Sequence, residues 1–537
     1  MIKDLSRRTL LKSSAATLIL TSAIGIAPKF ISPARAEGYA PGMTGGPTGF
    51  PGAERFQYNE GMSEGRAIEG VKKLVAAGTA PKTIRILMTD GAIGQLNKPF
   101  PGNAPSIQQI WEKETGIKIE IVGAPAEDLF KRVLQDVTTQ SAAYDVYMCA
   151  WNSVGDLVEA NAVVKLDDYV AKYSPDWLDP ERGALSPEVG EMLYKYDGHH
   201  YMVSCDGDYL TWFYNKPMYE DPKHQDAFEA KYGRKLVTPA TWEELDQISE
   251  YFTGQTGIAG QKMFGNGCEM GPFWGVPRYY ARFASQAMPN MYWFDENGRP
   301  NLDTAEGIRV AEQYMATKAW SSPDALSQTY AEGYGALGAG TTAHLLTWTN
   351  VSKFQDRNDA EGKPTTPLTD KMGAFLPVGN RFGDKVVRRS VIYYNVTGYV
   401  ASQSPAQEAA FLFLQWLTST RTYSWMAGNP GGYFDPFQKA NFEEPFVQET
   451  YHKYMTDATQ ETIKRCAPTI NIPGQASFDN ALDEELQAML AGQKGAEEAM
   501  QAATKKWQKI IQRKGEDKLV PLMNASRKAW PTIIDNA

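Results

Sequence analysis

The sequence has few of the residues that build metal and redox centres. Its 537 residues include five histidines and no HExxH motif. The four cysteines form no CxxC pair and stand far apart, at Cys149, Cys205, Cys268 and Cys466. We therefore expect no metal and no cofactor, while the choice among disulfide pairings stays open.

Signatures of nucleotide and hydrolase chemistry are also missing. There is no GxxxxGK[ST] loop and no GxSxG turn. The acid pairs Asp167-Asp168 and Glu243-Glu244 are typical of helix edges and caps. A glycosidase would need two carboxylates facing each other across a sugar. The sequence alone does not show whether two carboxylates lie in that arrangement. An exported carbohydrate-active enzyme therefore remains an alternative to a binding protein without chemistry.

Apolar stretches long enough to span a membrane are absent after the N-terminus, which has the order of a secretion signal. An arginine pair, Arg7-Arg8, precedes an uncharged apolar run over residues 13–28 and the small-residue site Ala34-Arg35-Ala36. The arginines followed by Leu10-Leu11-Lys12 are typical of a twin-arginine signal, with an ordinary secretory signal as the alternative. We expect cleavage after Ala36 and a soluble periplasmic protein, since no cysteine for lipid attachment is near.

A basic surface is lacking as well. Residues 37–537 carry 48 basic and 62 acidic side chains, a formal charge of −14. Nucleic-acid binding favours the opposite sign, so we expect no nucleic-acid partner.

What is present is an alternation of strand and helix patterns. Strands are predicted over 84–88, 117–122 and 145–150, with a helix opened by a Ser106/Gln109 capping box between the first two. This order predicts a parallel sheet. Before it, the Gly/Pro-rich residues 37–56 resemble a mobile arm, followed by a helix over 62–77. Further helices are predicted after capping boxes at 241–244 and 404–407, and over 479–513.

Six fragments, in order, resemble the family 1 extracellular solute-binding proteins of ABC importers over about residues 82–513. They are Trp111 to Ile119, Tyr144-Asp145-Val146, Tyr196-Asp197-Gly198 with Tyr214-Asn215-Lys216, Thr241 to Glu244, Ala409 to Leu414, and Asn471 to Gly474. The resemblance implies an α/β fold of the periplasmic binding protein type II class, in which two lobes joined by a hinge hold the ligand in the cleft between them. It also implies a carbohydrate ligand and permease partners in the inner membrane, and we expect a monomer.

The same resemblance implies where the chain divides. After the signal peptide (1–36) and an N-terminal arm with a short helix (37–81), lobe 1 would comprise 82–206 and 375–427, and lobe 2 would comprise 207–374 and 428–530. The first crossing between lobes is expected near Asp206 to Thr211 and a return crossing near Lys371 to Pro377.

Candidate ligand-binding residues combine aromatic planes, which stack on sugar C–H faces, with polar side chains that bind hydroxyls in pairs. Most follow predicted strands, where α/β sheets open their ligand crevice. The candidates are Asp90, Gly91, Trp151, Asn152, Asp206, Asp208, Trp274, Trp348, Asn350, Asn395, Gly432 and Tyr433. Asp208 is favoured over Asp206 because it matches a sugar-contacting acid of the maltose-type members.

Each candidate also has a purely structural interpretation. Asp90 is equally consistent with a turn or helix cap, Trp151 with packing on its own lobe, and the acids of the crossing with salt bridges. The Trp274 loop and the Gly431-Gly432-Tyr433 turn are consistent with simple loops. The function classes that follow are a carbohydrate-binding importer subunit, an exported enzyme, a binding protein for a non-sugar solute, and a ligand-sensing partner of a receptor.

Overall fold

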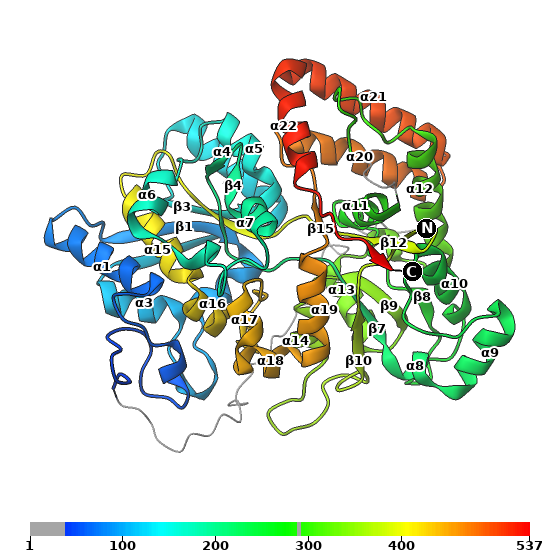
Figure 1. The fold of residues 1–537 in the computed structure, drawn as a ribbon, viewed down its shortest axis with the longest axis horizontal. Coiled ribbons are helices and arrows are strands. Elements are labelled where there is room, and N and C mark those ends of the chain that lie inside the picture. The colour runs from blue at the N-terminus through cyan, green and yellow to red at the C-terminus, as the bar shows by residue number, and fades with distance from the viewer. Residues whose placement is uncertain (1–37, 287–291, 537) are drawn as a thin grey trace, which may run out of the picture.

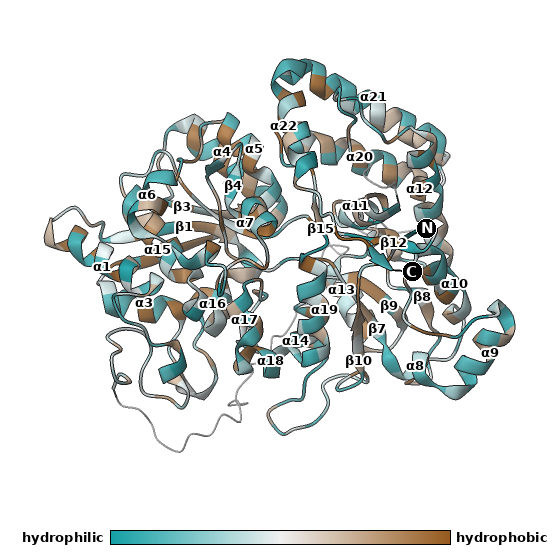
Figure 2. Ribbon diagram, in the orientation of Figure 1, coloured by the Kyte–Doolittle hydropathy of each residue, from teal (hydrophilic) through white to brown (hydrophobic). Residues whose placement is uncertain are grey.

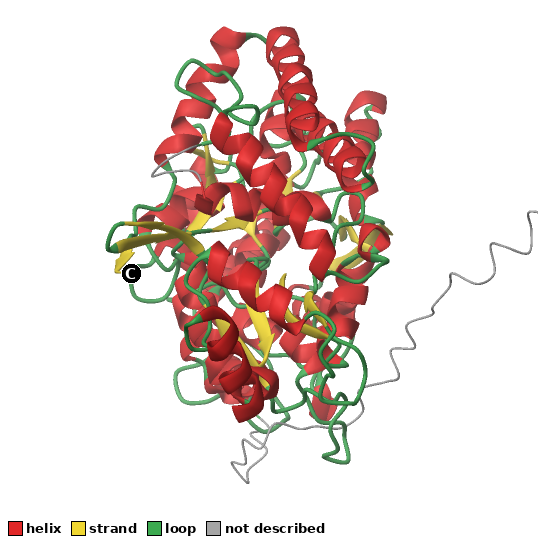
Figure 3. Ribbon diagram, turned by 90° about the vertical axis from the view of Figure 1, so that its right-hand side faces the viewer, coloured by secondary structure: helices red, strands yellow, loops and turns green. Residues whose placement is uncertain are grey.

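The computed structural model describes residues 38–286 and 292–536, and two α/β lobes lie side by side in it (Figure 1). The proposed signal peptide and its cleavage site lie outside the described residues. Strands run through the interior of the molecule and helices surround them (Figure 3). Colouring by hydropathy shows hydrophobic residues on these central strands (Figure 2).

The first lobe is built on a five-stranded sheet in the order β2-β1-β3-β14-β6. β1 (Thr83–Thr89) runs parallel to β2 (Lys118–Ala124) and to β3 (Val146–Ala150), as the sequence predicts. β14 (Val396–Val400) pairs antiparallel with β3 and with β6 (Val203–Ser204). The edge of the sheet opposite β2 is therefore formed by strands that follow β3 in the sequence.

The helices of the first lobe begin and end where local chemistry dictates. α3 (Ile107–Thr115) has the predicted capping box, in which Ser106 and Gln109 satisfy each other's backbone N–H, and it ends at Gly116 with φ 74°. α1 (Ser63–Ala76) confirms the helix predicted over 62–77 and packs against α15 (Gln407–Thr418). α15 starts after Ala406 without the predicted capping box, because the Ser404 hydroxyl donates to Asp145 instead.

The Gly/Pro-rich segment after residue 37 is packed, and the prediction of a mobile arm is wrong. Gly45 pairs with Tyr58 in a β-bridge, and Phe50, Phe56 and Tyr58 are buried in the core of the first lobe. The ring of Phe56 lies 4.6 Å from that of Trp425. The aromatic residues between the glycines indicated that this segment packs, and its high glycine and proline content obscured that indication.

Replacing Phe56 by alanine is expected to lower the free energy of unfolding by about 3 kcal/mol, because it leaves a cavity beside Trp425. Chemical denaturation followed by tryptophan fluorescence would measure the loss. The exposed Tyr39 of the same segment provides the control, since Tyr39→Ala removes a ring that is 45% exposed. A Phe56 variant as stable as wild type would show that the segment does not pack as described.

The second lobe is built on a four-stranded sheet in the order β10-β7-β9-β8. β7 (Thr211–Asn215) pairs antiparallel with β10 (Met372–Phe375) and with β9 (Thr342–Thr347), and β8 (Phe264–Asn266) runs parallel to β9. α10 (Trp242–Phe252) has the predicted Thr241/Glu244 capping box and packs on β8.

The C-terminal part of the chain forms helices over the second lobe, at the upper right of Figure 1. The prediction of one helix over 479–513 is wrong in one respect. α20 (Gln475–Leu490) and α21 (Ala496–Lys514) are separated by a turn containing Gly492 with φ 75°, and they pack against each other. The apolar stripe predicted for this stretch, which includes Met500 and Trp507, is buried.

Two segments cross between the sheets after β6 and before β14. The first, between β6 and β7, contains Asp206 to Leu210 and lies where it was expected. The return does not lie at 371–377, because these residues form β10 inside the second sheet. The chain first makes β11 (Gly379–Phe382), β12 (Lys385–Arg388) and β13 (Ser390–Ile392) and only then enters β14. The resemblance to the family gave no indication of the antiparallel strand pair β11–β12.

The remaining α-helices lie between the strands in sequence and in the outer layers of the structure. They are α2 (Ile93–Asn97), α4 (Leu129–Thr139), α5 (Val154–Glu159), α6 (Asp167–Tyr173), α7 (Pro187–Tyr194), α8 (Lys216–Glu220), α9 (Pro222–Tyr232), α11 (Gly275–Gln286), α12 (Ala305–Ala316), α13 (Tyr330–Gly338), α14 (Val351–Gln355), α16 (Thr420–Ala427), α17 (Lys439–Glu443), α18 (Pro445–Tyr451), α19 (Lys453–Ile463) and α22 (Glu516–Lys528).

Short strands complete the structure: β4 (Lys195–Tyr196), β5 (His199–His200), β15 (Cys466–Pro468) and β16 (Asp535–Asn536). His199 and His200 lie on one strand of the β4–β5 pair, and both contact the Asp167 carboxylate. The four cysteines are buried and unpaired. Within the described part of the chain, no helix is both long and apolar enough to cross a membrane.

Candidate functional site

Three parallel strands end at the same edge of the first sheet, and four predicted residues follow them. Asp90 and Gly91 come after β1 and are exposed. Asn152 follows β3 and is buried. Trp151 does not face the other lobe: its ring is fully buried, and its indole N–H donates to the Met192 carbonyl at 2.8 Å. For Trp151 the alternative of packing on its own lobe is therefore correct.

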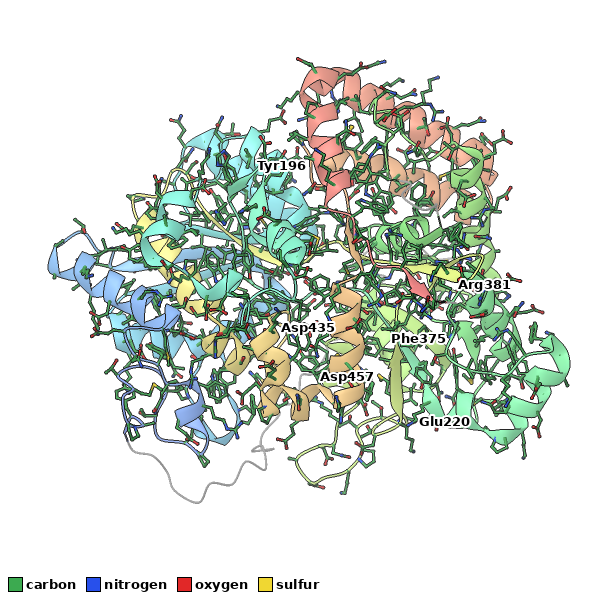
Figure 4. The ribbon with its side chains drawn as sticks, in the orientation of Figure 1. Tyr196, Glu220, Phe375, Arg381, Asp435 and Asp457 are labelled. Carbon is green, nitrogen blue, oxygen red and sulfur yellow. The ribbon has the colours of Figure 1, made fainter. Side chains whose placement is uncertain are left out.

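Three carboxyl groups meet where the chain crosses between the lobes. Asp206 and Asp208 come from the first crossing, and Asp435 comes from the loop after α16. Oxygen atoms of all three lie within 4.8 Å of one another, and all three residues are buried. Figure 4 shows Asp435 between the two lobes.

The hydrogen bonds of this group differ from one acid to the next. The Asp435 carboxylate accepts from the Tyr451 hydroxyl at 2.6 Å and from the Asn350 backbone N–H at 3.1 Å. One Asp206 oxygen accepts from the N–H groups of Gly207 and Asp435, while its other oxygen is buried without a partner among the described residues. Asp208 accepts from the Val396 N–H at 3.3 Å.

Burial and mutual repulsion shift the acidity of these groups. Burial, followed by the charges of Asp208 and Asp435, raises the pKa of Asp206 well above its usual range. Burial and the charge of Asp435 raise the pKa of Asp208 to about 8. Burial raises the pKa of Asp435 only to about 6, because the Lys353 charge and its hydrogen bonds favour the ionised form.

Lys353, on α14 of the second lobe, is the basic side chain that faces this group. Its ammonium is buried and donates to the Phe434 carbonyl at 2.6 Å. Burial lowers the pKa of Lys353 to about 8, while the charges of Asp435 and Asp206 oppose that shift. Lys353 and Asn350, whose amide donates to the Tyr433 carbonyl at 3.0 Å, thus attach the second lobe to the 432–435 loop.

Aromatic rings of the second lobe form a continuous group beside the acids. Trp274 lies 5.0 Å from Tyr330 and 5.7 Å from Trp348, measured between ring centroids. Trp274 and Tyr330 are half-buried, as are Tyr394 from the return crossing and Tyr433 from the 432–435 loop. Burial raises the pKa values of Tyr330, Tyr394 and Tyr433, and the Asp208 charge adds to the rise.

We call these eight residues the interlobe site: Asp206, Asp208, Trp274, Tyr330, Trp348, Tyr394, Tyr433 and Asp435. Five of them were predicted from the sequence. The carboxyl groups offer acceptors for hydroxyl groups, and the rings offer flat apolar faces.

A buried ion pair supports the aromatic group from behind. The Arg278 guanidinium stacks on Trp348 at 4.6 Å and forms a salt bridge with Glu269, which is fully buried. Glu269 also accepts from the Thr347 hydroxyl at 3.1 Å. Trp348 itself is 5% exposed, and its indole N–H has no partner within the described residues.

The glycine-rich turn is held by the first lobe. Gln95, on α2, accepts from the N–H groups of Tyr433 and Phe434 and donates to the Met426 carbonyl at 2.7 Å. A Cβ at Gly432 would overlap the end of the Gln95 side chain, so a side chain there would displace the amide that fixes this turn. Gly432 thus positions Tyr433, and its missing side chain does not by itself make room for a ligand.

Two predicted asparagines act within the hinge. Asn395 is fully buried, accepts from the Asp208 N–H at 3.1 Å and donates to the Ser204 hydroxyl at 3.0 Å. The side chain of Asn350 donates to Tyr433 and accepts from the Tyr334 hydroxyl. Both amides are hydrogen-bonded within the protein and position Asp208 and Tyr433, and direct ligand binding by either asparagine stays a prediction.

A second set of contacts joins the lobes through α5 and α20. Asp156 of the first lobe accepts from the Gly474 N–H at 2.6 Å and from the Ala476 N–H at 3.4 Å, at the start of α20. Glu159 accepts from Lys514 and Lys518 of the second lobe. Gly155 allows this approach, since a Cβ there would lie 2.5 Å from the Asn471 carbonyl oxygen.

Because these contacts join the two lobes, Asp156→Ala is expected to raise the Kd of the bound ligand several-fold without changing the interlobe site. A carboxylate at a helix N-terminus contributes about 0.5–2 kcal/mol, which the closed form alone would lose. Titration calorimetry measures the change, and Asp457→Ala, at an exposed helix position, is the control. Equal Kd values for Asp156→Ala and wild type would show that this contact does not favour closure.

A small cavity of about 20 Å³ lies within the second lobe, with room for one water. Its walls include Trp212, Trp242, Arg278 and Arg282, and none of the residues of the interlobe site. It is therefore separate from the site described above.

Several residues around the interlobe site escaped the sequence analysis: Gln95, Glu269, Arg278, Tyr330, Lys353, Tyr394 and Asp435. For Tyr394 a signal existed, because it adjoins the predicted Asn395. For Asp435 a signal also existed, because it lies two residues after the predicted Tyr433 in the same loop. Gln95, Glu269 and Lys353 act through backbone groups or other side chains that lie far away in sequence, so no local pattern indicates them.

Structures of similar fold are binding proteins of sugars and polyols. A solute-binding protein from Agrobacterium radiobacter K84 in complex with ribitol has a TM-score of 0.64 and 17% identity, covering 80% of this chain and 99% of that one. Maltose-bound T. maritima MalE3 has a TM-score of 0.62, 16% identity, and coverage of 79% and 99%. One from Agrobacterium vitis S4 with bound D-mannitol has a TM-score of 0.61, 17% identity, and coverage of 81% and 99%.

These likenesses confirm the predicted type II binding-protein fold. No curated protein sequence matches the chain. The family model of the bacterial extracellular solute-binding proteins matches residues 94–424, which is more than half of the chain. The protein therefore belongs to the bacterial extracellular solute-binding protein family, as the ordered fragments of its sequence indicate.

Proposed function

We propose that the protein is the periplasmic binding component of an ABC importer, which captures a carbohydrate or polyol at the interlobe site and delivers it to inner-membrane permeases. The observation that carries this proposal is the meeting of buried carboxyl groups and half-buried aromatic rings where the lobes join. Such a combination suits a ligand with many hydroxyls and flat C–H faces.

Within this site Asp208, Trp274, Trp348 and Tyr433 are proposed to contact the ligand, with Tyr330 and Tyr394 added to the predicted residues. Asp90 and Gly91 remain candidates at the strand edge, because they are exposed. Asp206 and Asn152 are proposed to lie behind the contacting residues. Export by the twin-arginine route, cleavage after Ala36 and a monomeric state are part of the same proposal.

The alternative of an exported glycosidase has less support. Glycosidases hold their two catalytic carboxyls about 5 to 10 Å apart with the sugar between them. The three acids of the interlobe site have oxygens within 4.8 Å of one another, which is closer than that spacing. This proximity suits a shared hydrogen-bond network better than two carboxyls on opposite sides of a glycosidic bond.

The proposal is tested by screening residues 37–537 for thermal stabilisation with sugars, polyols and amino acids. A ligand that binds only the folded state raises the melting temperature by mass action. We expect one carbohydrate or polyol to do so and to be recovered unchanged. Stabilisation by an amino acid alone would overturn the ligand class, and recovery of a cleaved sugar would establish the enzyme instead.

A further inference from the structure

The carboxyl groups of the interlobe site outnumber the basic groups that face them. Asp206, Asp208 and Asp435 are 0%, 4% and 0% exposed, and the buried cation against them is Lys353. Three ionised carboxylates this close in a buried place would repel one another strongly, and one ammonium balances only one of them. At least one proton must therefore be held within the group when the lobes are closed.

The hydrogen bonds indicate where that proton lies. Asp435 accepts donors on both of its oxygens and lies close to the Lys353 ammonium, so it is the ionised member. Asp206 keeps one buried oxygen without a partner among the described residues, and oxygen atoms of Asp206 and Asp208 lie within 4.8 Å of each other. The proton consequently belongs to the Asp206–Asp208 pair and not to either residue alone.

Other titratable groups around the pair do not compete for this proton. Burial raises the pKa values of the surrounding tyrosines, so they are neutral at the pH of interest, as is the buried thiol of Cys205. These tyrosines are Tyr209, Tyr330, Tyr334, Tyr394, Tyr423, Tyr433 and Tyr451. The charge balance thus depends on the three acids and Lys353.

Groups from both lobes create this buried environment. The Asn350 N–H and the Lys353 ammonium come from the second lobe, whereas Gln95 fixes the 432–435 loop to the first lobe. Separation of the lobes would admit water to the carboxyls and lower the cost of ionising them. The closed form therefore binds more protons than the open form.

We propose that closure of the lobes on a neutral ligand takes up about one proton onto the Asp206–Asp208 pair, so that ligand affinity falls as the pH rises. This inference rests on the proposed function, because it describes the regulation of the same site. Uptake of one proton makes the Kd rise by up to about tenfold per pH unit over the range in which the open form is ionised and the closed form is not. The protein would then release its ligand more readily in an alkaline medium.

The test is titration calorimetry at pH 7 with the carbohydrate or polyol found in the thermal screen, in two buffers with different heats of ionisation. Wild type should give different apparent enthalpies, corresponding to uptake of about one proton. Asp208→Asn should reduce that number toward zero. Glu114→Gln is the matched control, because burial also raises the pKa of Glu114 to about 7 but this residue contacts the Gly46 N–H within the first lobe. Equal enthalpies in both buffers for wild type would overturn the proposal.

A second readout is the pH dependence of thermal stability at a saturating concentration of the ligand from the thermal screen, which holds the lobes together. A pKa raised in this form contributes stability that is present at pH 4 and is lost as the pH rises toward 8. Melting temperatures of the ligand-bound protein should therefore fall less between pH 5 and 8 in Asp208→Asn than in wild type. Glu114→Gln should also flatten this fall, yet leave the ligand-linked proton uptake intact. Identical slopes for ligand-bound Asp208→Asn and wild type would contradict the inference, whereas a screen in which no carbohydrate or polyol stabilises the protein would contradict the proposed function.

Discussion

Trp348→Ala is expected to weaken ligand binding by about 100-fold, which makes it the substitution with the largest expected effect on affinity. The ring is almost fully buried between Arg278 and Trp274, and its N–H has no hydrogen-bond partner among the described residues. Removing a buried aromatic anchor at a binding site costs about 2 kcal/mol or more, and about 2.7 kcal/mol corresponds to 100-fold in Kd. Titration calorimetry with the ligand from the thermal screen measures the change.

A matched control separates the loss of a ligand contact from the loss of any tryptophan. Trp320, at the end of the short helix Thr317–Trp320 of the second lobe, is half-buried, and this helix packs against α10 and α12. Trp320→Ala should leave the Kd unchanged. If Trp348→Ala bound the ligand as tightly as wild type while remaining folded, the ligand would have to bind elsewhere.

Glu269→Ala is expected to reduce the free energy of unfolding by about 3–5 kcal/mol. Glu269 and Arg278 are 0% and 3% exposed, so removal of the carboxylate leaves a buried guanidinium without its charged partner. Chemical denaturation measures the loss. We also expect weaker ligand binding, since Arg278 holds the face of Trp348.

The control for this substitution is a salt bridge on the surface. Glu361 and Lys363 are paired, but each side chain is 71% exposed, so Glu361→Ala should leave stability unchanged. A Glu269 variant with wild-type stability would show that the Arg278 guanidinium reaches water or another acceptor, and the support described for Trp348 would be wrong.

The regular part of the first lobe was predictable because its signals are local. Ser106 and Gln109 fix the start of α3, Gly116 fixes its end, and alternating apolar residues mark β1 and β2. The break between α20 and α21 had a local signal in Gly492, and the predicted apolar stripe lies in α21 alone. The return crossing was missed because the antiparallel strands β11 and β12 precede it, and nothing in a strand pattern indicates which sheet it joins.

The site was predictable only in part, for a similar reason. Asp208 and Trp348 were found because they stand at strand ends or at a crossing. Position at a strand end does not determine on which side a ring packs, and Trp151 therefore turned out to be buried in its own lobe. Asp435 and Lys353 meet the other acids only through long-range folding, so their roles emerge from the structure alone.

Small-angle scattering with and without the ligand from the thermal screen tests the central claim most directly, namely that the two lobes close around a ligand at their junction. We expect the ligand to reduce the radius of gyration of wild type. Trp348→Ala should require a much higher ligand concentration for the same change. A ligand that stabilises the protein without changing its radius of gyration would contradict the account, because it would bind without closing the lobes.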